Sequence, residues 1–435
     1  MYLLYYIFIF IFCLPLSVYS YSPAIEYLIF YPEIPGASSA GIAGVVIALP
    51  DNSLRFYPNP SSVLNSFEIA INFNTIARDE GAHSSTYPGL SSNSVYNNAI
   101  NYAGIAYPVC IRNQNMVFSI SYRYLYDFNR DWMILSHKEH FQNNSKHYIQ
   151  TGGISALCFS SCFQLAPNFF TGISFNVSDN NISKNEWTQT YHYKNYFEDT
   201  LILDVNKRER YTFKGLSINW GFLWRINPNL SFGGIVVFPY TSDIQHKTTY
   251  TFKKTSMDES TEFYDSNESL YMPISYGAGL SYKWSDQLFF SMDVYHTRWD
   301  DFMYTDVNGN RKNPISGIPI HLSKTDPTWR LRSGIEYRHI NKNKEYVIPF
   351  RAGFFYDPAP STGCPDTILG LSLGLGLTYK HYSFDISYQY RFGNDIGKDL
   401  FSTFNYNFSQ NLREHKIYTG IIFYLSEFYT KGKKK

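Results

Sequence analysis

Small or polar residues alternate with apolar ones along most of this chain, and this period of two constrains the fold more than any other feature. Residues 369–379 place leucine at every odd position up to Leu377. Residues 382–391 then place tyrosine, phenylalanine or isoleucine at every even position. Because successive side chains of a strand point to opposite faces, this stretch predicts a β-hairpin with one apolar face and one face of glycine and polar groups.

The same alternation recurs along the rest of the chain from Ser66 onward. Fourteen strand-like segments have centres near residues 72, 102, 121, 155, 173, 218, 235, 277, 293, 334, 351, 374, 387 and 421. An even number of antiparallel strands is typical of closed bacterial membrane barrels. A soluble sandwich is the alternative, because its strands alternate in the same way around a packed core.

The connections between these segments separate the two alternatives. Every second connection is short, near residues 110–114, 166–168, 227–229, 285–286, 341–344 and 380–381. The others are long and polar, near residues 79–95, 128–146, 179–208, 241–269, 300–327, 357–367 and 393–413. Short turns at one end and long loops at the other are the asymmetry of transmembrane barrels, for which a sandwich offers no reason. We therefore predict an all-β fold, a transmembrane antiparallel barrel of 14 strands.

The composition agrees with this prediction. Aromatic residues make up 19% of the chain, with 39 Tyr and 35 Phe, which suits aromatic girdles at two membrane interfaces. The formal net charge is only +1, so no broad basic field exists for nucleic acid, and we expect no nucleic-acid partner.

The amino-terminal region is expected to carry two further domains. Residues 1–20 have an apolar run followed by the small-residue pattern Val18, Tyr19, Ser20, which predicts a cleaved export signal, although without an early Lys or Arg an uncleaved anchor is the alternative. Residues 21–65 lack barrel-like alternation and are rich in Gly, Ala, Ser and Pro. Side chains fill a barrel of about eight strands but not a wider one, so we predict that residues 21–65 plug the lumen. Residues 66–429 then form the barrel and residues 430–435 a basic tail.

The cysteines allow two interpretations. Cys13 lies in the export signal, and Cys158 and Cys162 are four residues apart on one strand, roughly 13 Å, too far to bond each other. Cys110 and Cys162 fall near the same barrel end, so they form a disulfide or remain free thiols. No Cys or His cluster has metal-ligand spacing, and we expect no cofactor and no metal.

Residues 36–63, "GASSAGIAGVVIALPDNSLRFYPNPSSV", resemble the amino-terminal hatch of the FadL/TodX family of outer-membrane fatty-acid and hydrocarbon transporters. The shared features are a small-residue run, an acidic residue near Asp51 and an Asn-Pro-Ala motif, which here is Asn59, Pro60 and Ser61. Further similarity lies in "GLSINWGFLWRINPNLSFGGIVVFPYT", "PISYGAGLSYKWSDQLFFSMDVYHTRWDDF", "RLRSGIEYR" and "IPFRAGFFYDPAP".

Three features depart from the family pattern. Ser61 replaces the usual Ala, and Pro50 precedes Asp51, but a hatch is compatible with both. The chain ends in a lysine-rich tail instead of an aromatic residue, which places recognition by the barrel assembly machinery in doubt. Phe428 and Tyr429 could supply that signal at the end of the last strand.

The resemblance implies a channel for passive uptake of hydrophobic molecules such as long-chain fatty acids. In that family the ligand is captured between extracellular loops, enters a lumen pocket near the hatch and leaves sideways through a kinked wall. The resemblance also implies a monomer in the bacterial outer membrane, with both termini in the periplasm and the long loops outside the cell. Outer-membrane lipids and a lipopolysaccharide-like surface would surround it. The alternative is a surface or secretion-associated barrel whose loops bind partner proteins and through which nothing passes.

The resemblance assigns the entrance to the third and fourth loops. The third loop carries Trp187, Tyr191 and Phe197, whereas the fourth, near residues 241–269, is mostly polar. A strongly apolar groove is therefore not evident, and loops shaped only by exposure are the alternative. The Asn59–Pro60 pair could start the turn from hatch to barrel, with or without a role in ligand contact.

Several arginines are expected to face the lumen. Arg330, Arg332 and Arg338 share the inward face of one segment, Arg351 lies on the next, and Arg391 lies two segments beyond. Because arginine pairs carboxylates through two hydrogen bonds, the cluster could hold a fatty-acid headgroup. We favour the alternative, in which these charges pair across the lumen and with the hatch.

No enzyme motif stands out. The chain has no G-x-S-x-G, P-loop or H-E-x-x-H sequence, and its 11 His are scattered. His296, on an outward face near a segment end, is expected at the membrane interface rather than in a catalytic site. We therefore predict that the protein is not an enzyme.

Overall fold

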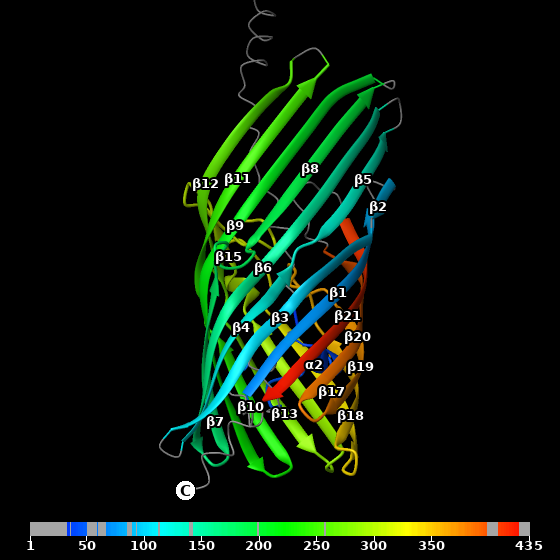
Figure 1. Ribbon diagram of the computed structural model, residues 1–435. Coiled ribbons are helices and arrows are strands. Elements are labelled where there is room, and N and C mark those ends of the chain that lie inside the picture. Colours follow the sequence, from blue (N-terminus) through cyan, green and yellow to red (C-terminus); the bar gives the residue numbers. More distant parts are fainter. Residues whose placement is uncertain are drawn as a thin grey trace, which may run out of the picture.

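The strands close on themselves as a barrel (Figure 1). The computed structural model describes residues 33–34, 36–49, 59, 67–84, 89–92, 94–111, 114–138, 142–197, 200–255, 258–397 and 408–425. Within these residues the predicted all-β, antiparallel barrel of 14 strands is confirmed. The closing contact joins β1 (Phe67–Ser84) to β21 (Phe408–Leu425), from Phe67 opposite Leu425 to Ser84 opposite Phe408.

Ten wall strands are continuous and four are interrupted in the described part of the chain. Besides β1 and β21, the continuous strands are β3 (Ser94–Ile111), β6 (Gln142–Ala166), β9 (Thr200–Asn227), β14 (Leu288–Thr297), β17 (Thr328–Asn341), β18 (Tyr346–Tyr356), β19 (Leu369–Tyr379) and β20 (Tyr382–Ile396). The interrupted ones are β4 (Gln114–Asp127) with β5 (Arg130–Lys138), β7 (Phe169–Ser178) with β8 (Glu186–Phe197), β10 (Leu230–Val237) with β11 (Tyr240–Lys254), and β12 (Ser260–Met272) with β13 (Ser275–Lys283). Shorter elements are α2 (Ala37–Gly41), β2 (Gly89–Ser92), η2 (Trp299–Asp301), β15 (Met303–Thr305) and β16 (Arg311–Lys312).

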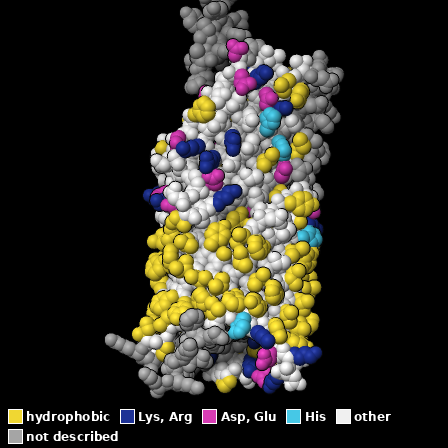
Figure 2. Space-filling model, in the orientation of Figure 1, with side chains coloured by type: hydrophobic (Ala, Val, Ile, Leu, Met, Phe, Trp, Pro, Cys, Tyr) yellow, Lys and Arg dark blue, Asp and Glu magenta, His cyan; other side chains and the backbone are white. Residues whose placement is uncertain are grey.

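The alternation sorts side chains between two surroundings. On β19 the odd-numbered leucines point outward and Leu373 is 62% exposed, whereas Ser372 is buried. Outward apolar side chains of this kind form a band around the lower half of the visible face (Figure 2). A continuous apolar surface of this size is stable next to hydrocarbon rather than water.

Three predicted loops are strands. Residues 128–146, 179–208 and 241–269 mostly continue the ladders as β5–β6, β8–β9 and β11–β12 hairpins that rise beyond the apolar band. We call these hairpins the upper extension. The loop prediction was wrong because both faces of these strands carry polar residues, so their alternation has little hydrophobic contrast.

The four interruptions lie beside one another where the apolar band meets the upper extension. The gap between β4 and β5 follows Asp127, which is opposite Gly153, and Gly153 is in turn opposite Glu186, where β8 begins after the gap from β7. The gap between β10 and β11 ends at Tyr240, which is opposite Met272, where the gap between β12 and β13 begins. Two of the gaps contain Pro239 and Pro273, which have no N–H to donate to a ladder. The wall therefore loses regular pairing along one line.

A further discontinuity separates β3 from β4, and we call it the wall break. Their pairing runs only from Ile111 opposite Gln114 to Tyr102 opposite Arg123. Beyond this point residues 94–100 of β3 are paired with β1, and the end of β4 is paired with β6. Two neighbouring wall strands thus part midway in the described residues.

The described part of the predicted plug lies inside the barrel. We call residues 33–34, 36–49 and 59 the inner segment; nearly all are buried, and α2 contacts β19 and β20. Wall glycines make this close approach possible: a methyl group on Gly334 would lie 2.7 Å from Ile42 Cβ, and one on Gly353 would lie 2.7 Å from the Ala43 nitrogen. Gly334 and Gly353 therefore face the packed inner segment, not open space.

The structure settles one alternative left by the sequence. The thiols of Cys110, Cys158, Cys162 and Cys364 are free, so the disulfide interpretation is wrong. Among the described residues, no helix is both apolar enough and long enough to cross a bilayer. The export signal, Phe428, Tyr429 and the basic tail lie outside the described residues.

We predict that Gly334→Val displaces the inner segment, because the new side chain would overlap Ile42. Overpacking of this kind costs about 1 to 3 kcal/mol. The measurement is the temperature at which the folded barrel loses its fast-migrating band on an SDS gel, together with protease cleavage of the inner segment. Gly81→Val is the matched control, since a methyl group there meets nothing closer than 3.8 Å; equal losses in both variants would contradict the prediction.

Candidate ligand pocket and its surroundings

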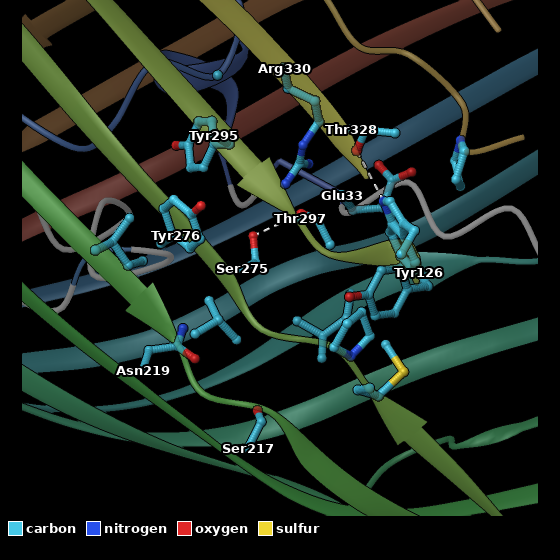
Figure 3. Close-up of a pocket in the computed structure, with 18 of the residues that line it drawn as sticks. Glu33, Tyr126, Ser217, Asn219, Ser275, Tyr276, Tyr295, Thr297, Thr328 and Arg330 are labelled. Carbon is cyan, nitrogen blue, oxygen red and sulfur yellow. Dashed lines mark hydrogen bonds between the residues drawn. The ribbon is translucent and has the colours of Figure 1, made fainter. Parts of the chain in front are cut away.

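A cavity of about 120 Å³ lies within the barrel between the inner segment and the upper extension (Figure 3). It sits beside the line of strand interruptions. Its lining comprises Glu33, Ile34, Gly44, Val46, Leu125, Tyr126, Ser217, Asn219, Ile235, Val237, Tyr240, Met272, Pro273, Ser275, Tyr276, Tyr295, Thr297, Trp299, Thr328, Arg330, Arg332, Pro358 and Pro360.

The lining is largely apolar with one polar edge. Ser275 and Thr297 hydroxyls lie 2.9 Å apart, and Thr328 and Arg330 lie on the neighbouring strand β17 (Figure 3). The Arg330 guanidinium lies 5.2 Å from the centre of the Tyr295 ring. An apolar pocket with a few polar groups suits a small hydrophobic molecule whose orientation is set at one end.

Backbone groups of the inner segment are held by side chains of the wall. Asp293 accepts hydrogen bonds from the N–H groups of Val46 (2.7 Å) and Ile47 (3.0 Å). Arg332 donates to the Ala43 carbonyl at 3.2 Å, and the Ser372 hydroxyl accepts the Ala43 N–H at 2.8 Å. The floor of the cavity is therefore positioned by specific polar contacts as well as by packing.

Glu33 ties the inner segment to the far wall. Its carboxylate lies 2.5 Å from Lys416 Nζ and accepts a hydrogen bond from Asn74 at 3.3 Å. The Glu33 N–H donates to the Leu125 carbonyl on β4 at 2.8 Å. The Ile34 carbonyl accepts a hydrogen bond from Asn101 on β3 at 2.7 Å. Residues 33–34 thus bridge the two strands that part at the wall break.

Three of the predicted lumen arginines form ion pairs around β17 and β18. Arg351 lies 2.5 Å from Glu336 and 2.5 Å from Asp385, and Arg338 lies 2.6 Å from Glu336. Arg332 lies 3.0 Å from Asp357. These contacts match the pairing alternative.

The remaining two arginines differ in their access to the cavity. Arg391 lies 3.1 Å from Glu414 and is buried away from the cavity lining. Arg330 lines the cavity, and its guanidinium lies 3.7 Å from the Asp357 carboxylate. Arg332 also lines the cavity, but Asp357 at 3.0 Å and the Ala43 carbonyl at 3.2 Å hold it more closely, so Arg330 has the best access to a ligand among the candidate arginines.

Only one residue of the predicted hatch motif lies in the described chain. Asn59 is buried and donates to the Ile47 carbonyl at 2.8 Å and to the Phe222 carbonyl at 3.1 Å. It thereby joins the inner segment to strand β9. Asp51, Pro60 and Ser61 lie outside the described residues.

The predicted entrance residues occupy strand β8 rather than a loop. Trp187 has 0% of its surface exposed and stacks on Tyr211 with ring centres 5.0 Å apart, so it is not on an open entrance surface. Tyr191 is half-buried beside Tyr148, with ring centres 4.7 Å apart. Phe197 is the last residue of β8, and its side chain lies outside the described part.

The sequence-based interpretation missed an aromatic row on the inner face of the upper extension. Tyr191 is opposite Tyr148 and Lys207, and Lys207 is opposite Tyr250, so all four share one face of the sheet. The alternation of threonine with Tyr250 and Phe252 in β11 was the signal that could have found it. Trp299 and the bridging role of Glu33 had no signal in a single sequence, because distant segments supply their partners.

A buried ion cluster lies above the apolar band. His246 lies 3.1 Å from Glu209 and 3.1 Å from Glu268, and its ring stacks on Tyr211 at 4.2 Å. Burial alone would lower the pKa of His246, but hydrogen bonds and attraction from the two carboxylates outweigh burial and raise that pKa to about 9. Burial would raise the pKa of Glu209, but His246 and Lys207 lower it to about 2. His246 and Glu209 are therefore both charged near neutral pH.

No group of three or more His, Cys, Asp or Glu side chains suited to a metal occurs in the described residues. His296 packs between Tyr276 and Trp329, with ring centres 5.1 and 4.3 Å away. It lies on the outer face near the end of β14, as predicted for an interface residue.

Comparisons with known proteins support the fold. No family model matches the sequence, and no curated protein matches it. Solved structures do match: a Pseudomonas aeruginosa FadL homologue has a TM-score of 0.63 at 13% identity, over 91% of this chain and 99% of that one. The CymD monoaromatic hydrocarbon channel has a TM-score of 0.55 at 14% identity (91% and 98% covered), and the Pseudomonas putida toluene transporter TodX has 0.55 at 11% (91% and 98%). The resemblance to FadL/TodX-type barrels is confirmed at the level of the fold.

We predict that the His246 cluster stabilises the protein most between about pH 4.5 and pH 6.5. The folded pKa of His246 lies above its ordinary 6.5, so its contribution is complete below 6.5 and is lost as the pH rises towards about 9. The folded pKa of Glu209 lies below its ordinary 4.5, so its contribution is lost as the pH falls towards about 2. The measurement is the difference in unfolding temperature between wild type and His246→Gln from pH 5 to pH 10. A difference that stays constant over that range would contradict it.

We predict that Asp293→Ala loosens the inner segment. The Val46 and Ile47 N–H groups would lose their acceptor in a buried site, at about 1 to 3 kcal/mol for each unsatisfied donor. Proteolysis of the inner segment in the folded barrel is the measurement. Asp286→Ala is the matched control, because that side chain is 86% exposed in a turn. Equal protection in both variants would show that Asp293 does not hold the segment.

Proposed function

We propose that this protein is an outer-membrane channel through which small hydrophobic molecules enter passively. The observation that carries the proposal is the apolar-lined cavity at the junction of the inner segment, the upper extension and the wall break. The structural neighbours include CymD, a monoaromatic hydrocarbon channel, and TodX, a toluene transporter. The short turns would face the periplasm, with both termini, and the upper extension would face the outside.

The size of the cavity favours a compact ligand. An apolar protein cavity of about 150 Å³ is known to bind benzene, and this cavity has about 120 Å³. A single aromatic ring or a short alkyl chain suits such a space. A long-chain fatty acid would need the lumen to enlarge, so we propose small hydrophobic compounds ahead of long-chain acids. Arg330 is the candidate partner for any polar end.

Entry would begin on the inner face of the upper extension. Tyr191 and Tyr250 present half-buried aromatic surface there, close to Lys207 in the same row. Aromatic faces attract apolar and aromatic molecules from water without demanding a precise fit. The ligand would then pass down towards the cavity.

Exit would take place sideways at the wall break. Exposed Ile100 and Ile120 flank its lower end, so the break opens within the apolar band. Backbone groups that face hydrocarbon must find protein partners, and the inner segment supplies one for β4 through the Glu33 N–H, which donates to the Leu125 carbonyl. On the β3 side the Asn101 side chain donates to the Ile34 carbonyl and ties the segment to that strand. Movement of residues 33–34 would expose a path from cavity to lipid, which is how a hatch would control release.

The remaining expectations follow from this proposal. The barrel would act as a monomer without catalysis, surrounded by outer-membrane lipids and lipopolysaccharide and inserted by the barrel assembly machinery. The alternative is a surface barrel that binds partner proteins without transport, and such a barrel would not require an apolar cavity in its lumen. Retention and exchange of a small hydrophobic compound therefore separate the two.

We predict that Ser275→Trp abolishes uptake of toluene into proteoliposomes or cells. Ser275 lines the cavity, so the indole would occupy the space of the ligand. Ser285→Trp is the matched control, because Ser285 lies in the exposed β13–β14 turn. The measurement is the initial rate of labelled toluene uptake, with folding checked by gel mobility. Unchanged uptake by a folded Ser275→Trp barrel would overturn the proposed route.

A further inference from the structure

We infer that Trp299 sets the maximum length of the molecule that the cavity accepts; this inference rests on the proposed function. Trp299 lies in η2, in the connection between β14 and β17, and lines the cavity. It also belongs to a buried apolar cluster within the barrel. The side chain therefore has ligand space on one side and apolar protein on the other.

The apolar cluster is built from the walls and from this connection. Strand β15 of the connection pairs with β12, with Tyr304 opposite Leu270. The cluster comprises Leu125, Phe128, Ile154, Ala156, Cys158, Trp187, Tyr211, Phe213, Ile244, Leu270, Met272, Trp299, Phe302, Tyr304 and Ile315. Its side chains are apolar or aromatic, so space opened next to them would suit hydrocarbon and not water.

Three residues belong to both the cavity lining and the cluster, namely Leu125, Met272 and Trp299. The first two are part of the wall, on β4 and β12. Trp299 is the largest of the three and comes from the connection between strands. Among the shared residues of the described chain, it is therefore the one whose truncation extends the cavity furthest into the cluster.

Hydrogen bonds and packing fix the indole in place. Its Nε1–H donates to the Thr328 hydroxyl at 3.0 Å, and its backbone carbonyl accepts a hydrogen bond from Asn313 at 2.9 Å. The ring packs edge-on against Phe302 with centres 5.4 Å apart. A side chain held by one hydrogen bond and by ring packing, on a backbone that Asn313 also holds, acts as a fixed barrier between cavity and cluster.

The chemical consequence concerns chain length. An alkyl chain that fills the cavity meets the indole, and further methylenes find no space. Each methylene that does find apolar space tightens binding about fourfold. With the indole removed, the space that it leaves joins the cavity to the apolar cluster, and longer chains gain that contact.

The experiment uses the full-length protein in lipid nanodiscs and the series from toluene to hexylbenzene. Binding is measured by calorimetry, with the signal from empty nanodiscs subtracted. In wild type the affinity should rise about fourfold per added methylene and then stop rising. In Trp299→Ala it should continue to rise for longer chains. Trp329→Ala is the matched control, because Trp329 is 57% exposed on the outer face of β17 and should leave the limit unchanged.

Each outcome decides a different claim. An identical length limit in wild type and Trp299→Ala overturns this inference and leaves the proposed function standing. Absence of binding by wild type across the whole series overturns both. Trp299→Leu and Trp299→Phe cover the case in which the alanine variant does not fold, and the limit should lengthen in the order Trp, Phe, Leu.

Discussion

The close contact between the inner segment and the glycine-bearing wall is the constraint on which the rest of the structure depends. Backbone can approach backbone at Gly334 and Gly353 only because no side chain intervenes. The approach brings the N–H groups of Val46 and Ile47 within reach of Asp293. A barrel too wide to be filled by its own side chains thereby gains a solid core, and the floor of the cavity is fixed.

The same segment compensates for the weakest part of the wall. Strands β3 and β4 part above Tyr102 and Arg123, which would leave edge groups near hydrocarbon. The Glu33 N–H donates to the Leu125 carbonyl on β4, the Asn101 side chain on β3 donates to the Ile34 carbonyl, and the Lys416 ion pair holds Glu33 there. Under the proposed function, these are the contacts that a hatch would have to break for lateral release.

The buried charges were partly foreseeable from the sequence. Alternation placed Arg332 and Arg351 on inward faces, and the structure confirms that they lie there as ion pairs with Asp357, Glu336 and Asp385. A sequence cannot rank such arginines by access to a ligand, because access depends on which carboxylates lie on neighbouring strands. The upper extension was missed for a related reason: polar strands give no hydrophobic contrast, and only pairing reveals them.

Period-two alternation and the regular sorting of short and long connections determined the architecture by themselves, because a strand's side chains must divide between two faces and a lipid-facing band must be apolar on one of them. Strand number and inward glycines follow from that local rule, and so does the prediction of a segment inside the lumen, where residues 33–34, 36–49 and 59 lie. The cavity, the wall break bridged by Glu33 and the barrier formed by Trp299 were decided only by the tertiary structure. Each requires groups far apart in the chain to meet, and one sequence carries no record of such distances.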